Sequence, residues 1–300
     1  MYAITGATGN TGSVVARNLL AKGEKVRVIG RSAERLESLT RLGAEAFVCD
    51  LADSATLTKA LTGARAVYAM IPPNLTSPGY RAYQDGISDA LARALQGAGV
   101  KHAVSLSSFG TDKTDGTGPV VGLRRLEEKL NAIPGLNVLH LRAGYFMENT
   151  LPQISIIKMM GITAGPVRPD LPLPMIATCD IGVAAAEALL KLNFGAHETQ
   201  ELLGQRDLNM TQATAIIGKA IANPGLRYMQ APSEQFRAGM TQLGVSVDFA
   251  NLILEMAAAL NSGHMGALET RSARNTTPTS YETFVNEEFV PRYHGKEAHA

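Results

Sequence analysis

Three glycines near the N-terminus have the spacing of a loop that binds phosphate. Gly6, Gly9 and Gly12 lie in the stretch ITGATGNTGSVV, residues 4–15, between a short apolar run and an amphipathic run. This pattern predicts a strand, a loop and a helix, whose N-terminal N–H groups and partial positive charge attract a pyrophosphate. A tight turn that needs glycine only for positive φ is the alternative, and the flanking strand and helix argue against it. We assign these residues to a dinucleotide site: Gly6, Thr8, Gly9, Asn10, Thr11 and Gly12.

Arg31 directly follows the apolar run KVRVIG, residues 25–30. A fold that prefers NAD usually has Asp or Glu there, on the ribose 2′-hydroxyl, whereas a guanidinium can pair with a 2′-phosphate. We therefore expect NADP(H) to be preferred, with NAD(H) as the other cofactor, and we include Ser32 in the site. A solvated arginine that begins a helix together with Glu34 is the alternative.

Two serines end the apolar run HAVSLSS, residues 102–108. If the run is a strand of a parallel sheet, Ser107 and Ser108 reach its carboxyl edge, where open α/β folds bind ligands. We include both in the cofactor site.

Six short apolar runs alternate with helix-length stretches in the first half of the chain, which predicts βαβ units. We expect an α/β fold, with a Rossmann-type doubly wound parallel sheet over residues 1–150 and a smaller mixed α/β C-terminal lobe over residues 151–300. A segment near residues 175–192 is expected to return to the first domain. The six runs are YAIT, KVRVIG, AEAFVCD, AVYAMI, HAVSLSS and NVLHLR.

Three features organise the predicted second lobe, which we assign to a substrate or a partner. A helix is expected to open at Asp180, and a strand is expected near residues 201–203. Thr279 and Glu282 have the spacing of a capping box at the start of a terminal helix.

Composition and charge favour a small, near-neutral partner. The 300 residues carry a net charge of +1. A charge this small does not attract nucleic acid or an anionic membrane. Cys49 and Cys179 lack the spacing of a metal site, so we expect no metal. No apolar run approaches the ~18 residues of a membrane span, and we expect no secretory leader because the first residues predict a strand directly. A cytoplasmic protein is expected.

Several stretches resemble the NmrA-like family of NAD(P)H-binding proteins. GATGNTG has the GxxGxxG spacing of the short-chain dehydrogenase/reductase superfamily, in the form of its extended and atypical branches. The resemblance covers essentially the full chain. It continues in CDLAD (49–53), RAGYFMEN (142–149), ATCDIGVAAAEAL (177–189) and TPTSYETFV (277–285).

The resemblance implies further site residues. Asp50 and Leu51 match family positions that border the adenine, although Asp50 could equally cap a helix. The family's backbone passes the adenosine and pyrophosphate at positions that match Met70, Ile71 and Pro72, with plain core packing as the alternative. The nicotinamide and acceptor are expected beside Tyr145 and Phe146, and Asn149 completes the predicted substrate pocket.

The superfamily's usual acid, a Tyr four residues before a Lys, is missing. It should fall in residues 116–130, GTGPVVGLRRLEEKL, which contain no Tyr. Tyr145 is therefore the candidate catalytic proton donor, and packing between the lobes is its alternative role.

The family divides between reductases of quinones, dyes or other electron-poor acceptors and regulators that sense the nicotinamide pool. Reduction of a quinone-like acceptor requires mainly proximity, so the missing dyad does not exclude it. We expect an NADP(H)-binding oxidoreductase that reduces a small quinone-like or aromatic acceptor by hydride transfer. The alternative is a non-catalytic NADP(H)-sensing regulator with a protein partner. A nucleotide-sugar epimerase is weaker because it needs the dyad.

Overall fold

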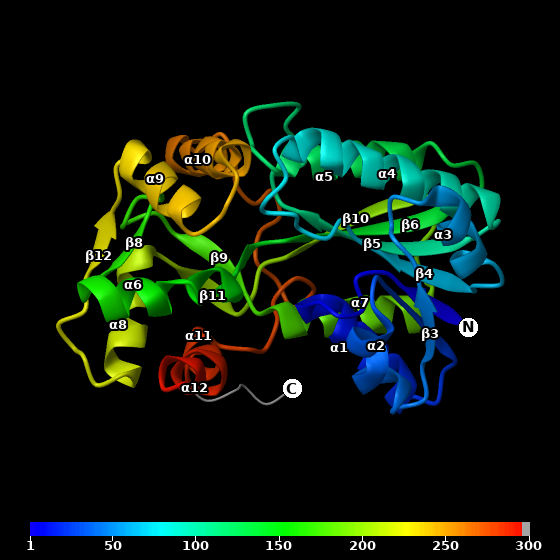
Figure 1. Ribbon diagram of the computed structural model, residues 1–300, viewed down its shortest axis with the longest axis horizontal. Helices are drawn as coiled ribbons and strands as arrows, with labels where there is room; N and C mark the ends of the chain where they lie inside the picture. Colours follow the sequence, from blue (N-terminus) through cyan, green and yellow to red (C-terminus); the bar gives the residue numbers. More distant parts are fainter. Residues whose placement is uncertain (296–300) are drawn as a thin grey trace.

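A seven-stranded sheet forms the centre of the larger lobe (Figure 1). Its neighbouring strands all run parallel, in the order β10-β6-β5-β4-β1-β2-β3. The order reverses between β1 and β4, and the carboxyl ends of strands at such a point form a ligand crevice in open α/β sheets. The strands are β1 (Tyr2–Ile4), β2 (Val26–Gly30), β3 (Glu45–Val48), β4 (Ala66–Ala69), β5 (His102–Ser108), β6 (Asn137–Ala143) and β10 (His197–Leu202).

Helices cover both faces of this sheet, as the alternating runs predict. One face carries α3, α4 and α5, and the other carries α1, α2 and α7 (Figure 1). The predicted Rossmann-type sheet is confirmed. The computed structural model describes residues 1–295, so residues 296–300 of the predicted second lobe lie outside the described residues. The helices are α1 (Asn10–Ala21), α2 (Ala33–Thr40), α3 (Ser54–Leu61), α4 (Tyr80–Gly97), α5 (Val120–Asn131) and α7 (Thr178–Lys191).

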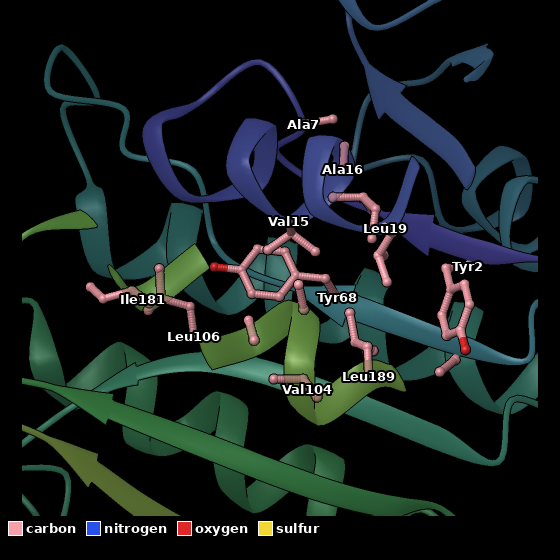
Figure 2. Close-up of a cluster of buried hydrophobic side chains, with 14 of the residues drawn as sticks. Tyr2, Ala7, Val15, Ala16, Leu19, Tyr68, Val104, Leu106, Ile181 and Leu189 are labelled. Carbon is pink, nitrogen blue, oxygen red and sulfur yellow. The ribbon is translucent and has the colours of Figure 1, made fainter. Parts of the chain in front are cut away.

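Strand β4 is buried on both faces, which explains its unbroken apolar sequence. Tyr68 points toward the face covered by α1 and α7, where it lies among Val15, Leu106 and Ile181 (Figure 2). Its hydroxyl donates a hydrogen bond of 2.9 Å to Thr11 Oγ1. This bond fixes the start of α1 to the middle of the sheet.

Thr5 joins β1 to β4 at the same edge of the sheet. Its hydroxyl donates to the carbonyl of Tyr68 over 3.0 Å and accepts from the N–H of Met70 over 3.1 Å. The chain that leaves β4 is therefore held directly beside the glycine loop.

The second lobe combines short strands with helices, so the smaller mixed lobe is confirmed. β11 is antiparallel to β9 and β7 is parallel to it, while β8 pairs with β12. The strands are β7 (Tyr145–Phe146), β8 (Thr163–Gly165), β9 (Leu173–Ile176), β11 (Arg206–Leu208) and β12 (Tyr228–Gln230). The helices are η1 (Met147–Thr150), α6 (Gln153–Met160), α8 (Met210–Ala220), α9 (Ser233–Gln242), α10 (Val247–Ser262), α11 (Tyr281–Phe284), η2 (Val285–Phe289) and α12 (Val290–Tyr293).

Helix α10 joins the two lobes at the start of α4. The Asp248 carboxylate accepts a hydrogen bond of 2.7 Å from the backbone N–H of Tyr80. Glu255 forms a 2.9 Å ion pair with Arg81. Because Gly79, the N-cap of α4, has no side chain that could cap it, the second lobe supplies the cap of a helix in the first.

Three expectations for the second half of the chain are corrected by the structure. The strand near residues 201–203 is β10, which pairs with β6 and belongs to the central sheet. Helix α7 begins at Thr178, two residues before Asp180. The terminal helix is capped by Ser280, because the Thr279 hydroxyl instead donates to Asp180 over 2.7 Å. Among residues 1–295, every helix is too short or too polar to cross a membrane.

Candidate functional site

The three glycines of the loop have three different structural roles. Gly6 has φ +60°, and a Cβ there would lie 2.5 Å from Met70 Sδ. A Cβ at Gly12 would collide with the Gly6 carbonyl, so only glycine lets α1 come this close to the loop. Gly9 is exposed, and the nearest atom to a Cβ there is the Gly6 carbonyl oxygen, at 3.3 Å. The space beyond Gly9 is therefore open to a ligand.

The N-terminus of α1 has no cap of its own. Its N-cap residue is Gly9, no side chain caps it, and its first turn contains no acidic residue. Helices α2 and α3, by contrast, are capped by Ser32 and Asp53. The first N–H groups of α1 are therefore donors for an anion, and the loop fits a pyrophosphate.

The loop's other side chains divide between solvent and core. Asn10 is exposed and Thr8 is half-buried. Thr11 is buried and its hydroxyl accepts the hydrogen bond from Tyr68. Its predicted contact with a cofactor is thus restricted to its backbone N–H.

A charged corner lies at the carboxyl ends of β2 and β3. Arg31 and Asp50 are both exposed there, and Arg31 forms no ion pair within residues 1–295. Asp50 accepts from the N–H of Ala52 over 2.9 Å. Helix α3 is capped by Asp53, so Asp50 is not its N-cap. Both Arg31 and Asp50 are free to face a ligand.

Tyr83 belongs to this corner and was missed by the sequence analysis. Its hydroxyl donates a hydrogen bond of 2.8 Å to the carbonyl of Pro72. Burial raises the pKa of Tyr83, while the charge of Arg31 lowers it and the charge of Asp50 raises it, which places both charges near the phenol. In the sequence, Tyr83 stands out only as an aromatic residue eleven positions after Pro72, which does not by itself reveal this hydrogen bond.

The remaining predicted cofactor residues are only partly accessible. Leu51 and Ile71 are buried in the core between the sheet and α3 and α4. Met70 and Pro72 are half-buried, and Met70 lies over Gly6. The chain after β4 therefore presents alternate residues to the crevice.

The two serines at the end of β5 face opposite ways. Ser107 is 2% exposed and its hydroxyl donates a 2.5 Å hydrogen bond to Glu127 Oε1. Its hydroxyl is thus bound to α5. The contact of Ser107 with a cofactor stays a prediction. Ser108 is half-buried, and its hydroxyl donates to the neighbouring Phe109 carbonyl over 2.9 Å.

Glu127, in the stretch where the resemblance predicts the dyad, forms a buried ion pair with Arg142. Glu127 of α5 accepts hydrogen bonds from Arg142 of β6 at 3.0 and 2.7 Å. Thr111 and Ser107 also donate to it. Burial raises the pKa of Glu127, but the hydrogen bond from Arg142, the influence of His140, the hydrogen bond from Ser107 and the charge of Arg142 together hold it below its ordinary value. The pair ties α5 to the carboxyl ends of β5 and β6.

The three predicted substrate residues have different surroundings. Tyr145 packs with the core of the second lobe, whereas Phe146 packs against the core between the sheet and α1. Asn149 is exposed. Burial raises the pKa of Tyr145 to about 12, so its phenol holds a proton at neutral pH. Tyr145 has the protonation state that a proton donor needs.

Glu148 organises the start of α7. One carboxylate oxygen accepts from the backbone N–H of Thr178 over 2.9 Å and from its hydroxyl over 2.5 Å. Burial raises the pKa of Glu148, although both bonds from Thr178 lower it. Glu148 thus caps the start of α7 from η1.

A hollow of about 340 Å³ lies beside β9, apart from these residues. Phe109, Leu173, Leu260 and Met265 line its apolar part, and Asp207 and Arg271 line its polar part. None of the predicted cofactor residues lines it, nor does Tyr145. No cluster of His, Cys, Asp or Glu in the described part of the chain could hold a metal ion.

Comparison with known proteins links this architecture to one family. The model of the NmrA-like family matches residues 2–289. An NAD(P)H azoreductase of Xenophilus azovorans is 28% identical over 275 residues, covering 90% of this chain and 91% of the relative. A structure of an NADPH-dependent quinone oxidoreductase of Escherichia coli with NADPH has a TM-score of 0.75 at 22% identity, with 100% of this chain and 96% of that chain covered. NmrA, a negative transcriptional regulator solved with NAD, has a TM-score of 0.72 at 16% identity, with 98% and 97% covered.

Replacing Glu127 by Gln should lower the free energy of unfolding by about 3 kcal/mol at pH 7, because it leaves Arg142 largely buried without a counter-charge. The pKa of Glu127 is lower in the folded protein than its ordinary 4.5. Its stabilising contribution is therefore complete above pH 4.5 and is lost as the pH falls through the folded value. Urea unfolding at several pH values measures the difference, which should shrink in acid.

Glu128→Gln is the matched control on the same helix. Glu128 is 54% exposed and pairs with Arg124, so its loss should change stability by less than about 1 kcal/mol. Equal losses in the two variants, or a Glu127 effect that stays constant down to pH 3, would contradict the assignment.

Proposed function

The chain belongs to the NmrA-like family, and on this premise we propose that it is an NADP(H)-dependent oxidoreductase that reduces a small quinone-like or aromatic acceptor. The observation that carries the proposal is the uncapped N-terminus of α1 behind Gly9. In this proposal residues 1–150 form the cofactor lobe together with α7 and β10, and the rest of the chain forms the acceptor lobe.

The residues present fit a dinucleotide along the carboxyl edge of the sheet. The N–H groups of Asn10, Thr11 and Gly12 would bind the pyrophosphate. Arg31 would pair with a 2′-phosphate, and Ser32 and Asp50 would border the adenosine. Tyr83 holds the Pro72 carbonyl and with it the chain that passes this end of the cofactor. Met70 and Ser108 extend the path toward β5.

The bound dinucleotide would supply the hydride, and the chain's own residues would orient the acceptor and protonate it. Tyr145 keeps its proton because burial raises its pKa to about 12. Its hydroxyl can donate to an acceptor oxygen that gains negative charge. The names of the related azoreductase and quinone oxidoreductase support an aromatic or quinone-like acceptor.

A regulator that senses NADP(H) without turnover is the second candidate. It is favoured by the missing dyad of a Tyr four residues before a Lys in residues 116–130, where Glu127 of α5 instead forms a buried ion pair with Arg142 of β6. The structural similarity to a transcriptional regulator supports the same reading. NADPH oxidation with a panel of quinones, azo dyes and simple carbonyls separates the two, because a regulator binds NADPH and oxidises it with none of them.

Gly9→Val should abolish NADPH binding while the fold is kept. Gly9 has φ −93°, which any residue can adopt, so the added side chain mainly fills the space in front of the helix N-terminus. Calorimetric titration with NADPH measures the loss, and circular dichroism checks the fold. Unchanged affinity in a folded variant would remove the loop from the site.

Arg31 should set the cofactor preference. The wild type is expected to bind NADPH at least ~1 kcal/mol more tightly than NADH, and Arg31→Asp should reverse this order because a carboxylate repels the 2′-phosphate. Arg41→Asp is the control, since Arg41 is exposed at the far end of α2 and pairs with Glu37. Equal dissociation constants for both cofactors in the wild type would make Arg31 an ordinary surface residue.

Tyr145→Phe should slow reduction of a simple carbonyl by roughly ten- to a thousandfold and reduction of a quinone by less. The quinone ring stabilises the reduced oxygen, whereas an alkoxide needs prompt protonation. Single-turnover NADPH oxidation with one acceptor of each kind measures this, and NADPH affinity should stay constant. Identical rates in both proteins would leave Tyr145 with a packing role only.

A further inference from the structure

The hollow beside β9 has walls from both lobes. Phe109 and Leu203 directly follow β5 and β10 of the first lobe, whereas Leu173 of β9 and Leu260 of α10 belong to the second. These four side chains are buried, and together with Met265 they form an apolar floor. The volume of about 340 Å³ lies within the range of about 300–1,000 Å³ that small-molecule pockets have. The hollow is therefore large enough for a small molecule that contains a ring.

One wall of the hollow is the chain that follows α10, residues 263–271 (orange in Figure 1). The carboxylate of Glu201, a buried residue of β10, accepts hydrogen bonds from two N–H groups of this wall, at Leu268 over 3.0 Å and at Glu269 over 2.7 Å. The wall is thus held against the end of the central sheet by contacts within the chain itself. A ligand would enter a site that is already formed, which lowers the entropy cost of binding.

Three charged side chains line the hollow, and they do not balance. Arg271 donates to the Asp207 carboxylate and to two backbone carbonyls, so its charge and its donors are already engaged. Glu269 accepts from neutral donors, the N–H of Glu201 over 3.1 Å and the side-chain amide of Asn275 over 3.2 Å, and it forms no ion pair within residues 1–295. Two carboxylates and one guanidinium leave the lining with one net negative charge.

This charge and the apolar floor lie at different depths. The side chain of Asp207 is 50% exposed and Glu269 is half-buried, whereas Leu173 and Leu260 are buried. A cationic group near the two carboxylates would keep part of its hydration while an apolar ring fills the floor. An anion in the same place would meet a lining of like charge. The hollow therefore favours a small cation with an apolar ring.

We propose that this hollow is a second ligand site, apart from the cofactor crevice, and that it binds a small molecule with an aromatic ring and an ammonium group. The ring would contact Phe109 and Leu260, and the ammonium group would lie beside Asp207 and Glu269. None of the predicted cofactor residues lines the hollow, so the proposal holds for a reductase and for a regulator alike. The bound molecule would touch both lobes at the ends of β5 and β10.

Titration with three probes that share a naphthalene ring tests the site and the ligand class: 1-naphthylmethylamine, 1-naphthylmethanol and 1-naphthylacetate. NMR of protein with ¹³C-labelled methionine methyl groups follows the binding. Met265 lines the hollow and Met70 lies over Gly6 in the crevice, and each signal is identified by its loss in a Met→Leu variant. The amine should shift the Met265 signal and leave Met70 in place, and it should bind at least about tenfold more tightly than the other two. Equal affinities, tighter binding of the carboxylate, or a shift of Met70 without Met265 would overturn the proposal.

Asp207→Asn should weaken binding of the amine by about tenfold, because it removes the net negative charge while the Asn oxygen can still accept from Arg271. Asp170→Asn is the matched control. Asp170 also pairs with an arginine of the second lobe, Arg168, but it does not line the hollow. The control should bind the amine as the wild type does, and melting temperatures check that both variants are folded. Equal losses in the two variants would contradict the site.

Addition of NADPH separates this site from the cofactor crevice. Saturating NADPH should shift the Met70 signal and leave the amine bound at Met265, since the two sites share no residue. Displacement of the amine by NADPH would place the probe in the crevice and overturn the proposal. If the wild type reduces no acceptor, the proposed function fails, and the Met265 titration still decides whether the hollow binds an aromatic amine.

Discussion

The close approach of α1 to the glycine loop is the contact on which most of the architecture depends. Gly12 lies so close to the Gly6 carbonyl that a Cβ atom at this position would collide with it. The same kind of contact continues outward, because a Cβ at Gly182 of α7 would lie 2.6 Å from Val14 of α1. From α7, Asp180 holds Thr279 and with it the start of α11. A series of close contacts thus runs from the loop to the C-terminal helices.

The ends of the central strands are fixed by polar groups that the hydrophobic core cannot replace. Thr5 and Tyr68 fix the ends of β1 and β4 next to the loop. Glu127 and Arg142 do the same for β5 and β6. A buried carboxylate with four donors is stable only in one arrangement, because each unmade bond would leave a polar group desolvated. The geometry of the carboxyl edge is therefore rigid before any ligand arrives.

The parts of the fold that follow from local chemistry could be predicted from the sequence. Apolar runs gave the six strands, and glycine spacing gave the loop between β1 and α1. Strand β10 was misplaced because its first residues are exposed and polar and the residues of β6 with which it pairs lie 59 positions earlier. The partner of the Ser107 hydroxyl could not be predicted either, because it depends on strand parity and on Glu127, a residue of another element. Tyr83 was missed because it lies inside α4 and acts on a loop that precedes the helix.

The cap that Asp248 places on α4 determines when the larger lobe can become complete. A chain emerging from the ribosome has made five of the seven central strands by residue 108, yet the acceptor for the N–H of Tyr80 follows 168 residues after that donor. Strand β10 and the helix that covers α1 also come late, after residue 177. The contacts that complete the larger lobe therefore form only after residue 248 of the second lobe has been synthesised. The larger lobe thus depends on the second for the cap of α4, although the two differ in architecture.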